Sequence, residues 1–363
     1  MQINQIGILG AGSWGSALAI AMSHIAPVLL WSRNSSQIES INVDRVNPPY
    51  LDNDILFPAN ITATTEFNQA LNSELIIIAT PSSALRDIFS RILSVYSADN
   101  VVDNTTAKTA NVAAFVWVCK GFEPGTGLLP HQIIQEIIPP SWSNIGALLG
   151  PSFAREVALG MPTAISLVSK NLQFAAAWAN KLKNIPNFRV YAHDDVIGSE
   201  IGAGVKNIMA IAVGISDGLG LGYNARAALI TRSLHELGRL VECLGGKSTT
   251  IYGLTGVGDL ILTCTGDLSR NRNVGLELAK GHKIEMILNK LGHVAEGVSA
   301  AREVYNISRQ LKLEMPIVDT VYKIIYENAD ITQSVAALLS REPKLEFDEI
   351  YSSSLKAGLC HIL

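Results

Sequence analysis

The sequence predicts an α/β N-terminal domain, with a mostly parallel sheet and helices on both faces, followed by an all-α C-terminal domain. Two observations favour this fold class. Short apolar runs alternate with helical segments through the first half of the chain, which is typical of a buried parallel sheet. After about residue 192, helical periodicity dominates. We therefore expect two domains, 1–192 and 193–363, which suits the length of 363 residues.

The expected strands are short, and most consist of apolar residues only. In order they are residues 6–9, 28–31, 75–78, 115–119, 145–149, 163–168 and 188–191. Ligands of such sheets bind beyond the carboxyl ends of the strands. Lys120, Gly150 and Ser152 fall at two of these ends and are therefore candidate ligand contacts.

A glycine motif directly follows the first expected strand. The run GAGSWG at 10–15 opens a helix of small and apolar residues, which is the context of the dinucleotide-binding fingerprint of a Rossmann-type domain. Gly10 would permit the tight turn, Gly12 the approach of the pyrophosphate, and Gly15 the close packing of helix on strand. The alternative is a glycine-rich turn that binds nothing.

The end of the second strand bears on the choice of cofactor. NAD-specific enzymes often place an acid there to hold the ribose 2′-hydroxyl. This chain has no acid before Glu39, and Arg33 could accept a 2′-phosphate instead. We expect NADP(H) to be preferred and NAD(H) to be usable. The alternative is an ordinary exposed arginine.

Composition argues against several function classes. The formal net charge is −4 without a dense Lys/Arg cluster, so a nucleic-acid partner is not expected. Cys119, Cys243, Cys264 and Cys360 form no CxxC pair, which indicates reduced thiols in a cytoplasmic protein. The histidines show no metal-ligand spacing, so no metal is expected. We see neither a leader nor an apolar run of bilayer length, so membrane insertion is not expected.

The second domain begins with a nearly uncharged helix that carries one cation, Lys206, followed by Asn207. Burying an ammonium group costs several kcal/mol, so such a group loses its proton or pairs with a carboxylate. A neutral amine can take a proton from a substrate alcohol. The alternative is a lysine at the helix surface that reaches out to solvent. Because the first domain would bind a hydride acceptor, we favour the catalytic interpretation.

A polar cluster lies further along the second domain. Asp259 and Thr263 are four residues apart and would share a helix face, where a carboxylate could orient a catalytic amine. Arg270 offers a planar fork for a phosphate, and Asn271 adds amide donors. A solvated turn between helices is the alternative for Arg270 and Asn271. Lys120 could equally be a surface lysine, and Ser152 a simple helix cap.

In these motifs the chain resembles the bacterial-type NAD(P)-dependent sn-glycerol-3-phosphate dehydrogenase family. The matching segments run in family order and cover nearly the whole chain: 10–15, 120–121, 150–154, 204–207, 224–230, 258–260, 269–272 and 296–297. The lysine helix and the segment SRNR at 269–272 are more specific to this family than the glycine motif.

The resemblance implies roles for individual residues. It makes Lys206 the proton acceptor, with Lys120 and Asp259 positioning the reacting oxygen. The implied substrate-binding residues, together with those proposed above, are Lys120, Gly150, Ser152, Lys206, Asn207, Asp259, Thr263, Ser269, Arg270 and Asn271. The implied dinucleotide contacts, added to the three glycines, are Ser13, Trp14, Arg33, Lys120, Ala154, Arg270, Val294 and Glu296.

The implied reaction is reversible hydride transfer between NAD(P)H and dihydroxyacetone phosphate, giving sn-glycerol 3-phosphate for phospholipid synthesis. The resemblance also implies a homodimer. Two other functions stay open: a dehydrogenase of the same domain plan acting on a hydroxy acid, and a redox sensor that only binds dinucleotide. Residues 98–113 and 341–363 depart from the family pattern but contain no matched motif.

Overall fold

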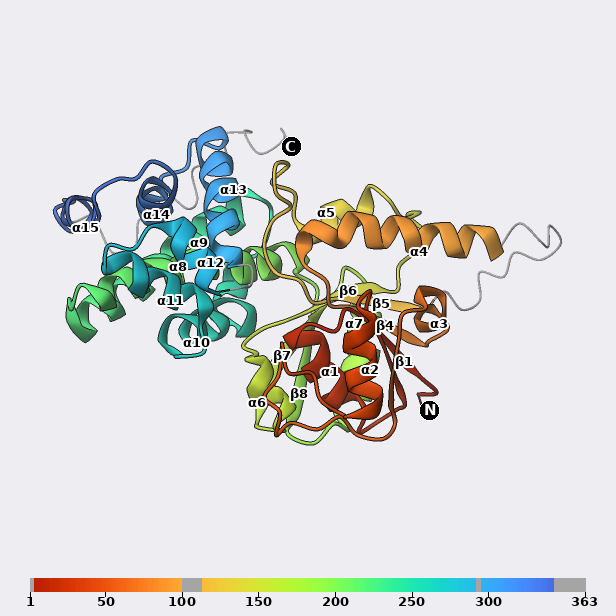
Figure 1. The fold of residues 1–363 in the computed structure, drawn as a ribbon. Helices are drawn as coiled ribbons and strands as arrows, with labels where there is room; N and C mark the ends of the chain where they lie inside the picture. The colour runs from red at the N-terminus through yellow and green to blue at the C-terminus, as the bar shows by residue number, and fades with distance from the viewer. Residues whose placement is uncertain (1–2, 100–112, 292–294, 343–363) are drawn as a thin grey trace. The chain divides into compact units, whose positions relative to one another are not determined.

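The computed structural model describes residues 3–99, 113–291 and 295–342 (Figure 1). These residues form two compact units. The first runs to Lys120 and takes in Pro130–Val196, whereas the second consists of Gly121–Leu129 and the chain from Ile197 onward. The predicted boundary after residue 192 lies four residues before the observed one, and no sequence pattern indicated that Gly121–Leu129 packs with the helices.

The first unit is built on one sheet of eight strands in the order β3-β2-β1-β4-β5-β6-β7-β8. All neighbours are parallel except β6 and β7, which pair antiparallel. The mostly parallel sheet is thus confirmed. The strands are β1 (Ile6–Leu9), β2 (Val28–Trp31), β3 (Ile61–Thr64), β4 (Leu75–Ile78), β5 (Ala114–Trp117), β6 (Ile145–Leu149), β7 (Thr163–Val168) and β8 (Phe188–His193).

Strand β3 was not among the expected strands, for a physical reason. This strand, ITAT, lies at the edge of the sheet and alternates buried with more exposed residues, so it lacks the continuous apolar run of its neighbours. The strands β1, β2, β4 and β5 are buried at every residue. Strands covered on both faces give the strongest sequence signal.

Helices cover both faces of β1. Ile6 and Ile8 pack in one cluster with Ala17 and Leu18 of helix α1. Gly7 points the opposite way, since a Cβ there would lie 2.2 Å from the Ala70 carbonyl oxygen of α3. The helical elements of this unit are α1 (Ser13–Met22), α2 (Ser35–Val43), α3 (Phe67–Leu71), η1 (Ser82–Ala84), α4 (Leu85–Asp99), α5 (Pro130–Gln135), α6 (Ala154–Ala158) and α7 (Leu172–Leu182).

The second unit is helical throughout its described elements, as predicted. These are α8 (Val196–Gly218), α9 (Gly222–Cys243), η2 (Ser248–Tyr252), η3 (Leu254–Gly258), α10 (Asp259–Thr265), α11 (Arg270–Ala279), α12 (Ile284–Leu291), α13 (Glu296–Gln310), α14 (Pro316–Tyr326) and α15 (Ile331–Leu339). The helix α8 is long and apolar enough to cross a membrane, but 89% of its most apolar window is buried inside the structure. It therefore has the burial of a core helix.

Small residues on α8 let its neighbours approach closely. A Cβ on Gly214 would lie 2.1 Å from the Arg272 carbonyl oxygen of α11, and one on Gly202 would lie 2.4 Å from the Thr255 carbonyl oxygen of η3. The core of this unit consequently forms around α8.

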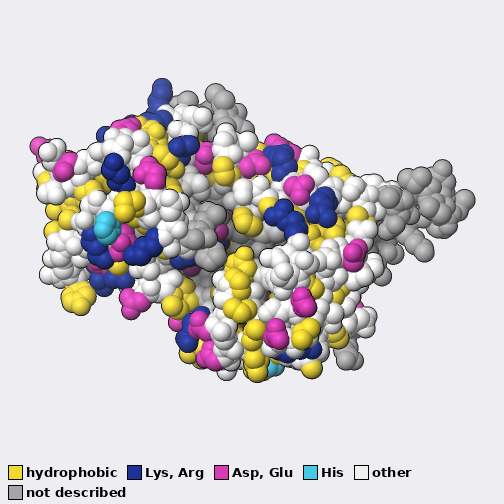
Figure 2. All heavy atoms as spheres, viewed as in Figure 1, with side chains coloured by type: hydrophobic (Ala, Val, Ile, Leu, Met, Phe, Trp, Pro, Cys, Tyr) yellow, Lys and Arg dark blue, Asp and Glu magenta, His cyan; other side chains and the backbone are white. Residues whose placement is uncertain are grey.

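On the surface seen in Figure 2, Lys and Arg side chains are interspersed with Asp and Glu.

Candidate active site

The glycine loop of the first unit has the geometry that the motif predicts. Gly10 has φ +119°, and a Cβ there would lie 2.7 Å from the Ala79 carbonyl oxygen. A Cβ on Gly15 would lie 1.9 Å from the Gly10 carbonyl oxygen, so neither position admits a side chain. Gly12 instead borders open space and precedes α1 without a side-chain cap. The first N–H groups of α1 are therefore available to an anionic ligand.

A polar network without a sequence signal holds the backbone of this loop at Ala11. The Ala11 carbonyl oxygen accepts hydrogen bonds from Gln37 Nε2 at 2.7 Å and from Asn47 Nδ2 at 2.9 Å. Asn47 is fully buried and also donates to Ser16 Oγ at 2.8 Å. These residues lie 26 and 36 positions beyond Ala11, so no local motif could have revealed them.

Two buried polar atoms near the loop have no hydrogen-bond partner among the described residues. They are Trp14 Nε1 at the start of α1 and Thr80 Oγ1, which follows β4. Because buried polar groups are normally paired, such atoms point to a ligand. Strands β1 and β4 are adjacent at the point where the strand order reverses, which is where dinucleotides bind in such sheets. Thr80 is therefore a candidate contact outside the predicted set.

Other predicted cofactor contacts lie on the same unit. Arg33 is exposed two residues after β2, and Ala154 begins α6, which packs against α1. Ser13 begins α1. Val294 lies outside the described residues.

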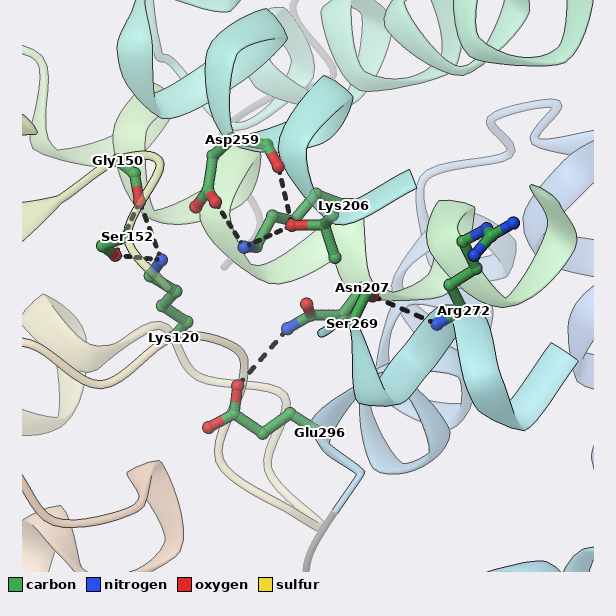
Figure 3. A network of polar contacts seen from close by, with 10 residues as sticks. Lys120, Gly150, Ser152, Lys206, Asn207, Asp259, Ser269, Arg272 and Glu296 are labelled. Carbon is green, nitrogen blue, oxygen red and sulfur yellow. Dashed lines mark hydrogen bonds and ion pairs between the residues drawn. The ribbon is translucent and has the colours of Figure 1, made fainter. Parts of the chain in front are cut away.

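The predicted contacts Lys120, Gly150 and Ser152 come together within the first unit (Figure 3). Lys120 Nζ donates to the Gly150 carbonyl oxygen at 2.9 Å and contacts Ser152 Oγ at 3.3 Å. Ser152 Oγ also donates to the Gly150 carbonyl at 3.0 Å. Gly150 has φ +138°, a conformation that favours glycine. Lys120 is therefore a half-buried cation held beside two oxygen atoms at the ends of β5 and β6.

Lys206 is buried, with 6% exposure, so the interpretation of a surface lysine is wrong. Its Nζ donates to Asp259 Oδ1 at 2.5 Å and to Thr263 Oγ1 at 2.8 Å (Figure 3). Thr263 Oγ1 in turn donates to the Asp259 carbonyl oxygen at 2.7 Å. Of the two outcomes expected for a buried ammonium, the structure shows the pairing with a carboxylate.

A π-helical turn delivers Asp259 to Lys206. The turn η3 ends at Gly258, directly before Asp259 at the start of α10. It packs against α8 at Gly202, one helical turn before Lys206. π-helical turns are rare and are frequently found at functional sites. Cys264, the residue after Thr263 on α10, is fully buried, and this burial raises the pKa of its thiol to about 12.

Asn207, Asn271 and Glu296 meet beside Lys206 in the second unit. Asn207 Nδ2 donates to Glu296 Oε2 at 3.3 Å, and Asn271 Oδ1 accepts from the Gly297 backbone N–H at 3.0 Å. Gly297 must lack a side chain, because a Cβ would lie 2.6 Å from the Asn207 carbonyl oxygen. The start of α13 is therefore fixed against the residue that follows the buried lysine.

In the segment 269–272, Ser269 and Arg272 make structural contacts, whereas Arg270 is exposed. Ser269 Oγ accepts from the Arg272 backbone N–H at 3.2 Å and so caps α11. The Arg272 side chain donates to Asp217 Oδ2 at 2.9 Å, with a side-chain exposure of 12%. Arg270 is exposed in the first turn of α11, where the helix dipole favours an anion.

Two family profiles match this chain, one over its N-terminal part and one over its C-terminal part. The sequence profile described as NAD-dependent glycerol-3-phosphate dehydrogenase N-terminus matches residues 5–175, and the C-terminus profile matches 195–336. A glycerol-3-phosphate dehydrogenase [NAD(P)+] of Thiobacillus denitrificans is 47% identical over 341 residues, covering 94% of this chain and 99% of that protein. The chain belongs to the NAD-dependent glycerol-3-phosphate dehydrogenase family. The predicted family and enzyme class, an NAD(P)-dependent oxidoreductase, are thus confirmed.

Solved structures agree with this assignment. The crystal structure of glycerol-3-phosphate dehydrogenase from Coxiella burnetii superposes with a TM-score of 0.82 at 38% identity, covering 93% of this chain and 99% of that one. A D-mandelate dehydrogenase with NADH shares only the fold, with a TM-score of 0.54 at 14% identity, covering 89% of this chain and 98% of that one.

Proposed function

We propose that this chain transfers hydride reversibly between NAD(P)H and dihydroxyacetone phosphate, forming sn-glycerol 3-phosphate, with Lys206 as general acid and base. The observation that carries the proposal is the buried group in which Lys206 of the core helix α8 meets Asp259 and Thr263 of α10, within the family's C-terminal part. A redox sensor that only binds dinucleotide has no need of this group. Burying an ion pair is weak as a stabilising device, so a chemical role explains it better.

The dinucleotide fits the glycine loop. Gly10, Gly12 and Gly15 would admit its pyrophosphate to the start of α1, and the buried Trp14 Nε1 and Thr80 Oγ1 lack partners among the described residues. We propose Gly10, Gly12, Ser13, Trp14, Gly15, Arg33, Lys120, Ala154, Arg270, Val294 and Glu296 as its contacts. When bound, its nicotinamide ring supplies or accepts the hydride.

Lys206 donates the proton in the reduction and accepts it in the oxidation. In the reduction, its ammonium gives a proton to the oxygen that becomes negative as the carbonyl carbon gains hydride. Asp259 stabilises the ammonium beforehand, and the hydroxyl of Thr263 accepts a second Nζ–H bond, which fixes the direction of the amine. In the oxidation, the amine takes the proton of the C2 hydroxyl.

The remaining substrate contacts are proposals on the same basis. Arg270 and Asn271, at the start of α11, would bind the phosphate, since a guanidinium and a helix N-terminus both attract an anion. Ser269 shapes this site as the cap of α11. We further propose that Lys120, Gly150, Ser152 and Asn207 contact the substrate, with Lys120 and Asp259 orienting the reacting oxygen.

A spectrophotometric assay tests the function. NADPH oxidation should occur with dihydroxyacetone phosphate and not with pyruvate. The reverse preference would establish a hydroxy-acid dehydrogenase. The absence of turnover with both compounds would favour a redox sensor that only binds dinucleotide. Lys206→Ala should abolish turnover while NADPH affinity stays within about twofold. The matched control is Lys323→Ala, an exposed lysine on α14 of the same unit, which should keep full activity. Wild-type turnover in Lys206→Ala would remove Lys206 from the mechanism.

Preference for NADP(H) over NAD(H) is a separate proposal that rests on Arg33. The guanidinium is exposed beyond β2, and it could pair with a 2′-phosphate that NAD(H) lacks. Arg33→Ser should lower kcat/KM for NADPH by about 10- to 150-fold, since a charge-assisted bond contributes about 1.5–3 kcal/mol. The value for NADH should stay within twofold. Equal losses for both cofactors would contradict a contact to the 2′-phosphate.

We also propose, on the family resemblance, a cytoplasmic homodimer that makes sn-glycerol 3-phosphate for phospholipid synthesis, without metal, nucleic-acid or membrane partners. Sedimentation equilibrium tests the dimer, with twice the chain mass of 39.0 kDa expected. A mass of one chain across micromolar concentrations would reject it.

A further inference from the structure

A cavity of about 610 Å³ lies within the second unit, bordered by α8, α9, α14 and α15. None of Lys206, Asp259 and Thr263 lines it. Its size falls in the range of small-molecule sites, which is about 300–1,000 Å³. Most of the wall is apolar, with Ala212, Ile215, Leu229, Val321, Ile324 and Val335 among its members. Such a lining suits a hydrocarbon chain.

Arg239 brings a cation to this apolar wall. It lies on α9 and lines the cavity, and its Nε atom is buried without a hydrogen-bond partner among the described residues. A guanidinium nitrogen that has lost water and gained no acceptor is unfavourable. A carboxylate in the cavity would correct this, because its two oxygens match the guanidinium fork.

The neighbouring acid does not fill that role. Glu236 lies one helical turn before Arg239 and is 2% exposed, but its oxygens accept from the backbone N–H groups of Ile317 at 2.7 Å and Val318 at 3.3 Å. Its carboxyl group therefore caps α14. Burial raises the pKa of Glu236 to about 7, so much of it is uncharged near neutral pH and repels an incoming anion only weakly.

The other charged residues of the wall lie at its rim. Arg341 pairs with Glu314 at 3.4 Å, and Arg232 and Glu342 are exposed. Among the arginines that line the cavity in the described residues, Arg239 is half-buried, whereas Arg232 and Arg341 are exposed. The ligand should therefore combine one negative group with an apolar body.

We propose that this cavity binds an amphipathic monocarboxylate, with its carboxylate on Arg239 and its hydrocarbon chain among α8, α9, α14 and α15. The site is separate from the Lys206 group. Ala212 and Ser216, which line it, follow Lys206 on α8 by 6 and 10 residues, or about 9 and 15 Å along the helix axis. The proposal does not depend on the reaction proposed above.

Calorimetric titration of the whole protein with sodium decanoate tests the site. We expect saturable binding of one decanoate per chain, and at least tenfold weaker binding of decan-1-ol, which has the same chain without the charge. Equal affinity for the alcohol, or no saturable binding of decanoate, would overturn the proposal. This comparison uses the wild-type protein and needs no variant to fold.

Two arginines of the same wall provide matched variants. Arg239→Met removes the buried cation and keeps an apolar stem, and it should weaken decanoate binding at least tenfold. Arg232→Met removes an exposed cation of the same lining and should change binding less than twofold. Equal effects of the two variants would show unspecific attraction to positive charge and reject the site.

A second copy of the chain could cover the same wall, and sedimentation in the presence of decanoate distinguishes this case. We expect the sedimentation coefficient to stay constant while decanoate saturates. Binding that requires dissociation of a complex between copies would show that the wall is an interface, and would contradict the proposal.

Discussion

Removing one or both partners of the Lys206–Asp259 ion pair should change the free energy of unfolding in a way that tests whether the pair stabilises the fold. The side chains are 7% and 1% exposed, and they meet at 2.5 Å. Asp259→Leu leaves a buried ammonium without its carboxylate, which costs about 3–5 kcal/mol. Lys206→Met combined with Asp259→Leu removes both charges and fills the space with apolar atoms. Such replacements are often neutral or stabilising by about 1–4 kcal/mol. Thr263 keeps its bond to the backbone carbonyl at position 259.

Urea unfolding followed by circular dichroism measures these free energies for the wild type, both single variants and the double variant. The double variant should be inactive and yet at least about 3 kcal/mol more stable than Asp259→Leu alone. Glu136→Gln is the control, since its ion pair with Arg86 has exposures of 53% and 40% and should contribute under about 1 kcal/mol. A double variant as unstable as the sum of its single variants would refute the reasoning, because removing the second charge would then recover no stability and the two residues would act independently.

Three further predictions concern the second unit. Gly202→Ala places a Cβ 2.4 Å from the Thr255 carbonyl oxygen, so it should cost about 1–3 kcal/mol in urea unfolding and lower kcat, whereas Gly238→Ala, with only Ile251 Cδ1 at 3.4 Å, should not destabilise. The folded chain raises the pKa of Glu236 from 4.5 to about 7, and thus holds this proton more tightly than the unfolded chain. Stability should therefore fall by about 3 kcal/mol as pH rises through this range, and Glu236→Gln should lack that component of the pH dependence. Cys264, with its pKa raised from 9.0 to about 12, should react with iodoacetamide about 1,000-fold more slowly than a thiol of ordinary pKa; mass spectrometry that finds it labelled at that ordinary rate would contradict its burial.

The sequence predicted best what depends on local spacing. Fully buried strands and the glycine loop show patterns that need no distant partner, and both appear in the structure where expected. The edge strand β3 escaped because only alternate residues are buried. The Gly121–Leu129 segment escaped because its packing depends on distant residues, such as Glu303, which accepts from the Gly125 backbone N–H at 3.0 Å.

The candidate site shows the same limit. A buried lysine needs a carboxylate for reasons of solvation alone, and Asp259 was a candidate from the sequence. The two residues are 53 positions apart, however, and only the fold brings them into contact. Gln37 and Asn47 fix the glycine loop without any sequence signal. Polar networks of this kind depend on side chains that converge after folding, so periodicity does not reveal them.

Two glycines near Lys206 make the burial of its ammonium group possible, and this burial bears on proton transfer. Gly202 admits the π-helical turn that delivers Asp259, and Gly297 admits the start of α13 against the Asn207 backbone. Lys206 and Asp259 are both buried. The exclusion of water from these charged groups lowers the stability of the fold but strengthens the electrostatic contacts that remain. A surface lysine would be easier to fold, yet its ammonium would be solvated and free to rotate. Holding Lys206 between a carboxylate and a hydroxyl fixes the amine before substrate arrives, so proton transfer requires little reorganisation of the protein.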